Sequence, residues 1–215
     1  MSTKSRRRAP VCTRRWTAVN ESAYPHEQSA LERIRAAVPD ADPWRAWSNF
    51  SFATSAGELY EIDLLIAAPS GLHLVELKSW RGRVTAAGPG WVQTNESNVQ
   101  IAHGRPLRLL FHKCTALERL LAAAGENVAI RPALCVSNDR LQVDLPGRDR
   151  RHVLTVDSLL IRLARPTHNA RHRMTKERVD AVERALTSVG ISAPDQTPSA
   201  DWPTMNLFTG LNGNA

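Results

Sequence analysis

Cysteines and long apolar stretches are scarce in this sequence, and their scarcity argues against two classes of protein. The chain of 215 residues has three cysteines, Cys12, Cys114 and Cys135, which are odd in number and far apart. This spacing does not suit a disulfide framework or a zinc ribbon, so a reducing, cytoplasmic setting is expected. The longest apolar stretches, such as 64–68, are far too short to cross a bilayer, and no apolar segment follows the basic start. We therefore expect neither a membrane span nor a secretory signal.

Signatures of several classes of catalyst are also missing. The sequence has no Gly-x-x-x-x-Gly-Lys-Ser/Thr phosphate loop, no Gly-x-Ser-x-Gly nucleophile elbow, and no His-Arg-Asp or Asp-Phe-Gly element of a protein kinase. His168 and His172 have the spacing of two metal ligands on one helix face, but arginines crowd them and no third ligand is near. Any catalytic chemistry must therefore rest on other residues.

Positive charge is concentrated in two segments. The formal net charge is +7, and residues 1–15 carry six basic and no acidic groups. Residues 140–178 carry ten basic and four acidic groups, whereas 16–139 and 179–215 have a slight acidic excess. Basic arms and basic faces attract polyphosphates because they release counterions, so DNA is an expected partner. A solubilising arm and a solvated helix face remain the alternatives for the two segments.

The composition predicts one globular domain with two tails, since 42% of the residues are apolar and 23% are charged. Residues 1–20 have few apolar positions in phase, which predicts a basic, disordered arm. Residues 21–190 make up the predicted domain. Residues 191–215 are rich in Pro, Ser, Asn and Gly, a composition that is typical of a flexible tail or a linker.

Hydrophobic periodicity predicts an α/β or α+β layered fold with a mixed sheet. Apolar residues at helical spacing indicate helices, and alternation or short apolar runs between turn residues indicate strands. The expected helices cover 22–38, 106–124, 157–164 and 175–189, and the expected strands cover 44–54, 58–67, 72–79, 82–86, 91–94, 128–136 and 152–156. The order is helix, three strands, helix and strand, followed by a small C-terminal strand–helix–helix addition.

Two adjacent strands carry the residues that are most suited to catalysis. Residues two apart in a strand share a face, so Glu76 and Lys78 point the same way. A short loop makes the two strands antiparallel neighbours and brings Asp63 beside the second strand. The residues that flank it, Ile62 and Leu64, are expected to face away from Asp63.

Two carboxylates and an ammonium group on one half-buried face are costly unless they are paired or bind a cation. Asp63 and Glu76 repel each other, so one of them would be protonated at neutral pH unless a divalent cation lies between them. Mg²⁺ or Mn²⁺ takes oxygen ligands and keeps several waters, one of which can attack a phosphodiester. Lys78 would orient that water or stabilise the charge that develops on the phosphate. The alternative is a salt-bridged strand pair, Lys78 with Glu76 or Asp63, on a solvent-facing sheet.

The hairpin and its surroundings resemble a known family, the NERD (nuclease-related) domain of the PD-(D/E)xK nuclease-like superfamily. The resemblance covers about residues 22–136, and it implies a restriction-endonuclease-like α-β-β-β-α-β core with a mixed sheet flanked by helices. The chain is also similar to the N-terminal portion of defence kinases of the BREX, or phage growth limitation, kind. The matching segments are His26-Glu27-Gln28, Asp63, Glu76-Leu77-Lys78, Trp80-Arg81-Gly82-Arg83-Val84 and Arg105-Pro106-Leu107.

The resemblance implies a role for each matching residue. Asp63, Glu76 and the backbone carbonyl of Leu77 would hold Mg²⁺ or Mn²⁺, and Lys78 would be the catalytic lysine. Glu27 would be an accessory metal ligand or water binder, and the alternative for it is a first-turn glutamate that complements the helix dipole. The implied activity is metal-dependent hydrolysis of DNA phosphodiester bonds in phage defence or DNA processing. The alternative function is a non-catalytic nucleic-acid-binding or docking module of a defence kinase.

The sequence departs from the family pattern on the long helix, where Leu109 stands near a position that often holds glutamine. His103 and His112 are alternative sources of a polar group there. Trp80 either packs in the core or stacks on a base. The candidate nucleic-acid ligands are arginines of the arm and of the segment after the hairpin, namely Arg6, Arg7, Arg8, Arg81 and Arg83.

Overall fold

The computed structural model describes residues 15–20 and 25–192, and the rest of the chain lies outside this description. The strands are β1 (Trp16–Ala18), β2 (Arg45–Ala53), β3 (Leu59–Ala68), β4 (Gly71–Lys78), β5 (Arg83–Ala87), β6 (Gly90–Thr94), β7 (Gln100–Ala102), β8 (Ile130–Val136), β9 (Gln142–Asp144) and β10 (Val153–Thr155). The helices are α1 (Pro25–Ala37), α2 (Pro106–Ala123), α3 (Gly147–Arg150), α4 (Val156–Ala164) and α5 (Lys176–Ser188).

Six strands form a mixed sheet in the order β1-β2-β3-β4-β8-β10. Its centre is the antiparallel meander β2-β3-β4, in which a tight turn joins β3 to β4. Gly71 in this turn has a φ of 132°, a conformation that a residue with a side chain rarely adopts. β8 pairs in parallel with β4 and β10 in parallel with β8, because the chain crosses over the sheet between these strands. The mixed sheet expected from the sequence is confirmed.

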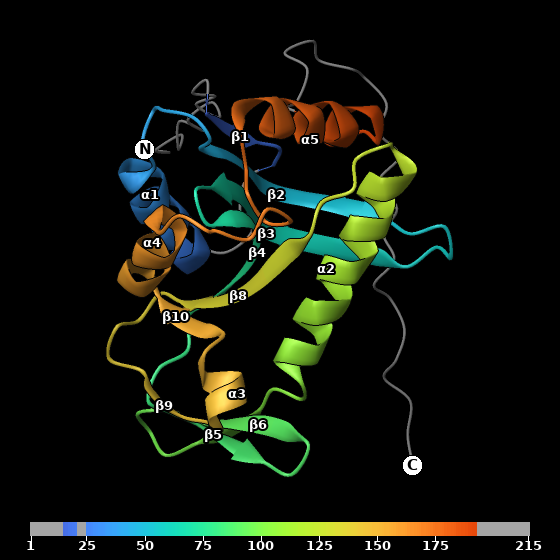
Figure 1. The fold of residues 1–215 in the computed structure, drawn as a ribbon. Helices are drawn as coiled ribbons and strands as arrows, with labels where there is room; N and C mark the ends of the chain where they lie inside the picture. Colours follow the sequence, from blue (N-terminus) through green and yellow to red (C-terminus); the bar gives the residue numbers. More distant parts are fainter. Residues whose placement is uncertain (1–14, 21–24, 193–215) are drawn as a thin grey trace, which may run out of the picture.

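Helices cover both faces of this sheet (Figure 1). α2 and α5 pack on one face, which we call the α2 face, and α1 and α4 pack on the other, the α1 face. Residues of β4 alternate between the two cores: Leu72 and Leu74 pack on the α2 face, and Val75 and Leu77 pack on the α1 face. Within residues 15–20 and 25–192, no helix combines the length and the apolar character needed to span a membrane.

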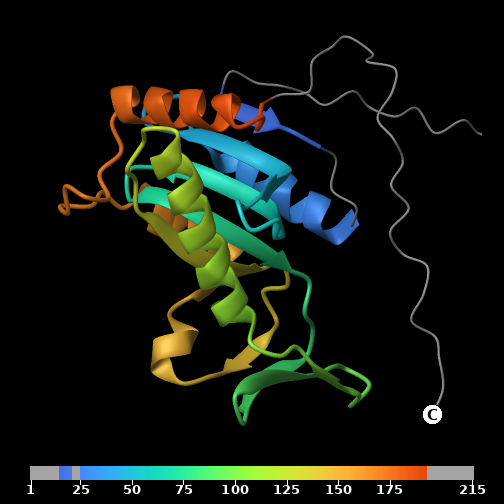
Figure 2. The ribbon, with the colours of Figure 1, turned by 90° about the vertical axis from the view of Figure 1, so that its right-hand side faces the viewer.

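A second, smaller sheet has the order β7-β6-β5-β9. β5 and β6 form the hairpin expected for 82–86 and 91–94, and β9 pairs in parallel with β5. Gly82 precedes this hairpin with a φ of 82°, and a Cβ atom there would lie 2.1 Å from the carbonyl oxygen of Thr94, so only glycine fits. Figure 2 shows this sheet below the large sheet, next to the lower end of α2.

The order α1, β2, β3, β4, α2, β8 along the chain is the helix, three strands, helix and strand expected from the sequence. β10, α4 and α5 are the expected strand, helix and helix that follow. They do not stand apart as an addition, because β10 extends the large sheet, α4 joins the α1 face and α5 joins the α2 face.

The prediction of a disordered arm over 1–20 is wrong at Trp16–Ala18, which form β1. This strand pairs in parallel with β2. Trp16 is 3% exposed, and its indole Nε1 donates a hydrogen bond to Ser48 Oγ at 3.0 Å. Parallel pairing of three residues with a distant strand leaves no periodic signal in the sequence, which explains the error. Residues 1–14 lie outside the described part of the chain.

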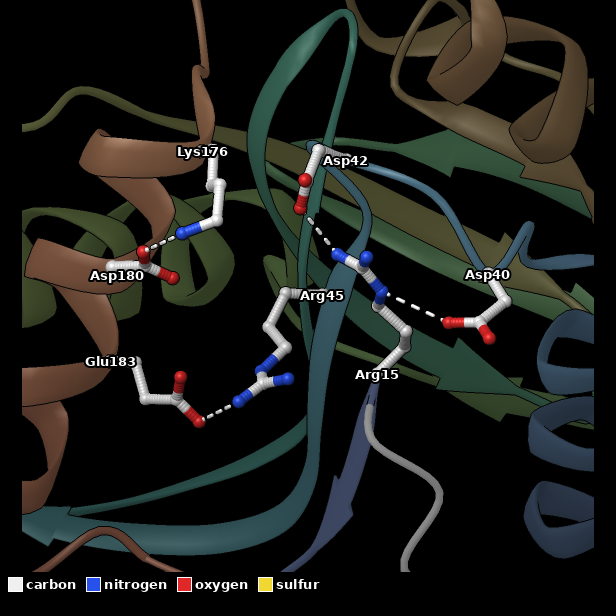
Figure 3. A network of polar contacts seen from close by, with 7 residues as sticks. All are labelled: Arg15, Asp40, Asp42, Arg45, Lys176, Asp180 and Glu183. Carbon is white, nitrogen blue, oxygen red and sulfur yellow. Dashed lines mark hydrogen bonds and ion pairs between the residues drawn. The ribbon is translucent and has the colours of Figure 1, made fainter.

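Ion pairs connect the first and last elements to the centre of the fold (Figure 3). Arg15, just before β1, donates hydrogen bonds to Asp40 and Asp42 in the segment between α1 and β2. Arg45 of β2 pairs with Glu183 of α5. Ion pairs at or near the surface contribute about 1 kcal/mol or less each. Their main effect is therefore to fix β1 and α5 in position against β2.

Candidate active site at the fork between β3 and β4

The candidate site lies where β3 and β4 separate. The two strands pair from their turn as far as Leu64 opposite Val75, and the pairing ends there. Beyond this fork β3 continues beside β2, and β4 continues beside β8. The carboxylate of Asp63 then takes the place of a neighbouring strand, because its Oδ2 accepts a hydrogen bond from the backbone N–H of Leu77 at 2.6 Å. A buried N–H group needs an acceptor, so this bond fixes Asp63 against β4.

The strand alternation breaks at Asp63. We expected both of its neighbours to face away from it, but Ile62 packs in the core of the α2 face and Leu64 in the core of the α1 face. The break coincides with Asn49 of β2, which occupies the register position opposite Asp63 and has a φ of 54°. A residue in the left-handed region interrupts the regular pleat of a strand. The expectation that Ile62 and Leu64 share one face is therefore wrong.

Two lysines hold Glu76. Its Oε1 accepts a hydrogen bond from Lys78 Nζ at 2.8 Å, and its Oε2 accepts one from Lys113 Nζ at 2.6 Å. The Glu76 side chain is 14% exposed and that of Lys113 only 9%. Both oxygens of this nearly buried carboxylate are thus paired with ammonium groups, which offsets the cost of burying its charge. The predicted shared orientation of Glu76 and Lys78 is confirmed.

Asp63 and Glu76 have pKa shifts of opposite sign. Burial and the negative charge of Glu76 raise the pKa of Asp63 to about 7, although the Leu77 N–H acts to lower it. Burial would also raise the pKa of Glu76, but the ammonium groups of Lys78 and Lys113 outweigh it and hold that pKa below its ordinary value. Glu76 is therefore ionised at neutral pH, and Asp63 holds its proton more readily than an ordinary aspartate. Two carboxyl groups with separated pKa values are typical of acid–base and cation-binding sites.

Glu27 belongs to the same electrostatic group. It lies in the first turn of α1, and its negative charge contributes to raising the pKa of Asp63. Burial would lower the pKa of Lys78, but the negative charges of Glu76, Asp63 and Glu27 outweigh burial and raise it. The structure therefore brings together Asp63, Glu76 and Lys78, and it places Glu27 near enough for its charge to act on Asp63 and Lys78. Their catalytic roles stay predictions.

Lys113 is a site residue that was not predicted from the sequence. It lies on α2 between Leu110 and Cys114, on the side of the helix that is buried against the sheet. A lysine in phase with an apolar stripe is the signal that would have identified it, because a buried ammonium group needs an anionic partner. Lys113 supplies the polar contact from the long helix that Leu109 cannot make.

The two histidines considered for that role do not bond to the carboxylates. His103 Nε2 donates a hydrogen bond to Gln93 Oε1 at 2.8 Å, and the His103 ring stacks on Trp80 with 4.4 Å between the ring centroids. Burial, together with the charge of Lys78, lowers the pKa of His103. Trp80 is 8% exposed and packs in the core. His112 lines a separate cavity beside the β2–β3 connection.

The structure describes Arg81 and Arg83 of the predicted nucleic-acid ligands but not the arginines of the arm. Arg6, Arg7 and Arg8 lie outside the described residues. Arg81 is exposed between β4 and β5. Arg83 on β5 is also exposed, and its guanidinium group lies 2.6 Å from a carboxylate oxygen of Asp144 on β9. Nucleic-acid binding by these residues stays a prediction.

Metal binding at the fork also stays a prediction. The carboxylates of Asp63 and Glu76 and the carbonyl of Leu77 are oxygen ligands of the kind that Mg²⁺ prefers, so the donor set fits this ion. Among residues 15–20 and 25–192, no three His, Cys, Asp or Glu side chains are grouped so that they alone could hold a metal ion. The carbonyl and water would have to complete the coordination, and the cation would compete with Lys78 and Lys113 for Glu76.

The sequence matches one known protein family over the part of the chain that contains the candidate site. The family model described as nuclease-related domain, NERD, matches residues 22–137, which is more than half of the chain. The chain belongs to the NERD family. The NERD match contains α1, the β3–β4 fork and all of α2. Every residue of the candidate site, Lys113 included, therefore lies inside the NERD domain.

The chain is also similar to a much longer bacterial protein. The chain is 43% identical over 182 residues to a protein named probable kinase PglW from Streptomyces coelicolor. The aligned part covers 84% of this chain but 12% of the relative, so the chain spans a small fraction of that protein's length. No solved structure matches the chain.

Proposed function

We propose that this NERD domain is a metal-dependent phosphodiesterase that cleaves DNA. The observation that carries the proposal is the pair Asp63 and Glu76 beside Lys78 at the strand fork, where repulsion between the carboxyl groups contributes to a pKa of about 7 for Asp63. A divalent cation between the two carboxylates would relieve this repulsion. Membership of a family described as nuclease-related supports the same chemistry. The proposed catalytic core is restriction-endonuclease-like and consists of α1, β2, β3, β4, α2 and β8.

Each residue of the fork has a role that follows from its position. Asp63, Glu76 and the Leu77 carbonyl would hold Mg²⁺ or Mn²⁺, which supplies an activated water and neutralises phosphate charge. Lys78 would orient the attacking water and stabilise the negative charge that develops on the phosphate. Glu27 would accept a hydrogen bond from the same water. Lys113 would keep Glu76 ionised and in place.

A non-catalytic nucleic-acid-binding or docking module is the second candidate function. The observation that favours it is the pairing of both Glu76 oxygens with Lys78 and Lys113. A carboxylate held in this way can serve packing alone, because its charge is already compensated. Both candidates predict a stable fold, but only the phosphodiesterase predicts turnover.

We further propose that the domain works inside a larger phage-defence protein. The relative named probable kinase PglW is much longer than this chain. The sequence contains none of the kinase signatures, so kinase activity would reside in another part of such a protein. The partners of the domain would then be DNA and either a fused kinase or other defence proteins.

Nicking of a supercoiled plasmid in Mg²⁺ or Mn²⁺, with EDTA as the blank, tests the proposed activity. Asp63→Asn and Lys78→Met should each slow nicking about a hundredfold or more, because they remove a cation ligand and a charge-stabilising group at nearly constant size. Glu61→Gln is the matched control, since Glu61 lies on the same strand and is exposed, and it should keep wild-type activity. Equal background nicking by the wild-type chain and both site variants would leave only the binding module.

A further inference from the structure

A groove lined by arginines lies at the start of α2. It has a volume of about 320 Å³ and lies between α2, α3 and the β6 hairpin strand. Figure 1 shows α3 beside the lower end of α2 and next to the small sheet. Arg105, just before α2, and Arg108 of α2 line one side of the groove. Arg148 of α3 and Arg151, at the C-terminal end of α3, line the other. These four guanidinium groups share the groove with a single acidic residue, Asp149.

The positive charge of the groove is poorly compensated. In the part of the chain that the structure describes, no carboxylate pairs with Arg105, Arg108 or Arg151. Asp149 contacts Arg148 at 3.8 Å, which is close to the limit for an ion pair. Guanidinium groups that converge without counter-charges repel one another, and they match phosphate oxygens in geometry and charge. The groove is therefore suited to a polyanion with regularly spaced phosphates.

An aromatic ring also faces the groove. Phe111 follows Arg108 by three residues on α2, lines the groove and is 42% exposed. Its ring meets His152 edge to face, with 5.2 Å between the centroids, so its orientation is held. Arginines for phosphates and an exposed aromatic ring for a base are the combination by which proteins bind single nucleic-acid strands.

We propose that this groove binds a single nucleic-acid strand, with Arg105, Arg108 and Arg151 on its phosphates and Phe111 against an unpaired base. In naming DNA as the strand, the inference rests on the proposed function, but the binding itself needs neither metal nor cleavage. Arg108 precedes Lys113 of the candidate site by five residues, which is about 8 Å along a helix axis. The groove and Lys113 therefore both lie along the N-terminal half of α2.

Fluorescence anisotropy of a labelled single-stranded oligonucleotide in EDTA tests the groove. Arg105→Ala/Arg108→Ala should weaken binding about tenfold or more and make the slope of log affinity against log salt shallower by about 1.4, because two phosphate contacts are lost. Arg119→Ala/Arg184→Ala is the matched control, which removes the same charge from exposed positions elsewhere on α2 and on α5. It should keep most of the affinity and the salt slope. Equal losses of affinity in the two double variants would show that net charge alone attracts the oligonucleotide, which would overturn the proposed binding groove.

The Phe111→Leu variant tests whether the groove prefers a nucleic-acid strand to other polyanions. It should weaken binding of the oligonucleotide about fivefold or more, because base stacking is lost, and leave binding of inorganic polyphosphate unchanged. An unchanged oligonucleotide affinity, or an equal loss for polyphosphate, would overturn the assignment. Circular dichroism and thermal melting check that each variant is folded.

The binding and cleavage results are independent of each other. Weaker binding by the arginine variants, with no cleavage by the wild-type chain in Mg²⁺ or Mn²⁺, would remove the proposed phosphodiesterase and keep the groove. Cleavage by the wild-type chain, with unchanged affinity in Arg105→Ala/Arg108→Ala, would remove the groove and keep the phosphodiesterase.

Discussion

Lys113 of α2 donates a hydrogen bond to Glu76 of β4, with 2.6 Å between Nζ and Oε2, and this contact joins the helical layer to the candidate site. Lys78 bonds to the other carboxylate oxygen at 2.8 Å. Because the Lys113 side chain is nearly buried, its charge depends on Glu76 for compensation as much as Glu76 depends on it. The acidic site is thus part of the packing between α2 and the sheet.

Replacement of this lysine should destabilise the fold. Lys113→Met removes a hydrogen bond between two charged and largely buried groups, so we expect the free energy of unfolding to fall by about 2 kcal/mol. Urea unfolding followed by circular dichroism measures this change. In Glu76→Gln/Lys113→Met the loss should be smaller than the sum of the two single losses, since the partners act as a pair. Additive losses would contradict the pairing.

Asp63→Asn should stabilise the protein at alkaline pH in EDTA. Because the folded-state pKa of Asp63 is raised to about 7, the favourable contribution of its protonated form is lost as the pH rises through 7. Asparagine keeps an oxygen acceptor for the Leu77 N–H and has no charge for Glu76 to repel, so we expect a gain of about 1 kcal/mol at pH 8. Thermal melting at pH 8 measures it. Glu61→Gln should show no gain, and a less stable Asp63→Asn would refute the repulsion.

A buried histidine should lower the stability of the protein in mild acid, a contribution opposite in sign to that of Asp63. His73 of β4 is fully buried, and burial, with the positive charges of Arg131, Arg162 and His172, lowers its pKa to about 3. Its stabilising contribution is complete above the unfolded-state pKa near 6.5 and is lost as the pH falls towards 3.

Between pH 7 and pH 5 this loss should amount to about 2 kcal/mol, at about 1.4 kcal/mol for each pH unit below 6.5. Urea unfolding of the wild-type chain and of His73→Gln at the two pH values measures it. From pH 7 to pH 5 the wild-type chain should lose about this much stability relative to the variant, in which the contribution of Asp63 is unchanged. The matched control is His112→Gln, which changes an exposed histidine and should keep the wild-type dependence. An identical pH dependence in His73→Gln would disprove this origin.

The first described strand should contribute strongly to stability. Trp16→Ala removes a buried indole from β1, together with its hydrogen bond to Ser48, and should lower the free energy of unfolding by about 3 kcal/mol. Leu59→Ala at a position that is 68% exposed serves as the control and should change it by less than about 0.5 kcal/mol. An unchanged urea midpoint in Trp16→Ala would mean that β1 is dispensable.

The centre of the site could be predicted because its signals are local. Period-2 alternation placed Glu76 and Lys78 on one face, and the short turn before Gly71 brought Asp63 to the neighbouring strand. The helix that contains Lys113 was evident from its apolar stripe. Each of these inferences needs only a few consecutive residues, and the structure agrees with each one.

The features that escaped prediction depend on contacts between distant segments. β1 and β9 are three-residue strands that pair in parallel with β2 and β5, and neither pairing leaves a pattern in its own residues. The partner of Lys113 is 37 residues away in the sequence. The break at Asp63 reflects Asn49 on another strand, where a positive φ cannot be read from alternation. These features are determined by contacts between distant segments, so the local sequence pattern could not predict them.

The residue at position 63 must accept the hydrogen bond from the Leu77 amide, whether or not it carries a charge. Alanine at this position would leave the Leu77 amide without an acceptor, and the longer side chain of glutamate would place its carboxylate beyond the amide. Asparagine alone among the neutral residues matches the reach and the acceptor of aspartate. A single nucleotide change in the codon can thus remove one carboxylate of the proposed metal site and leave the strand fork in the same shape.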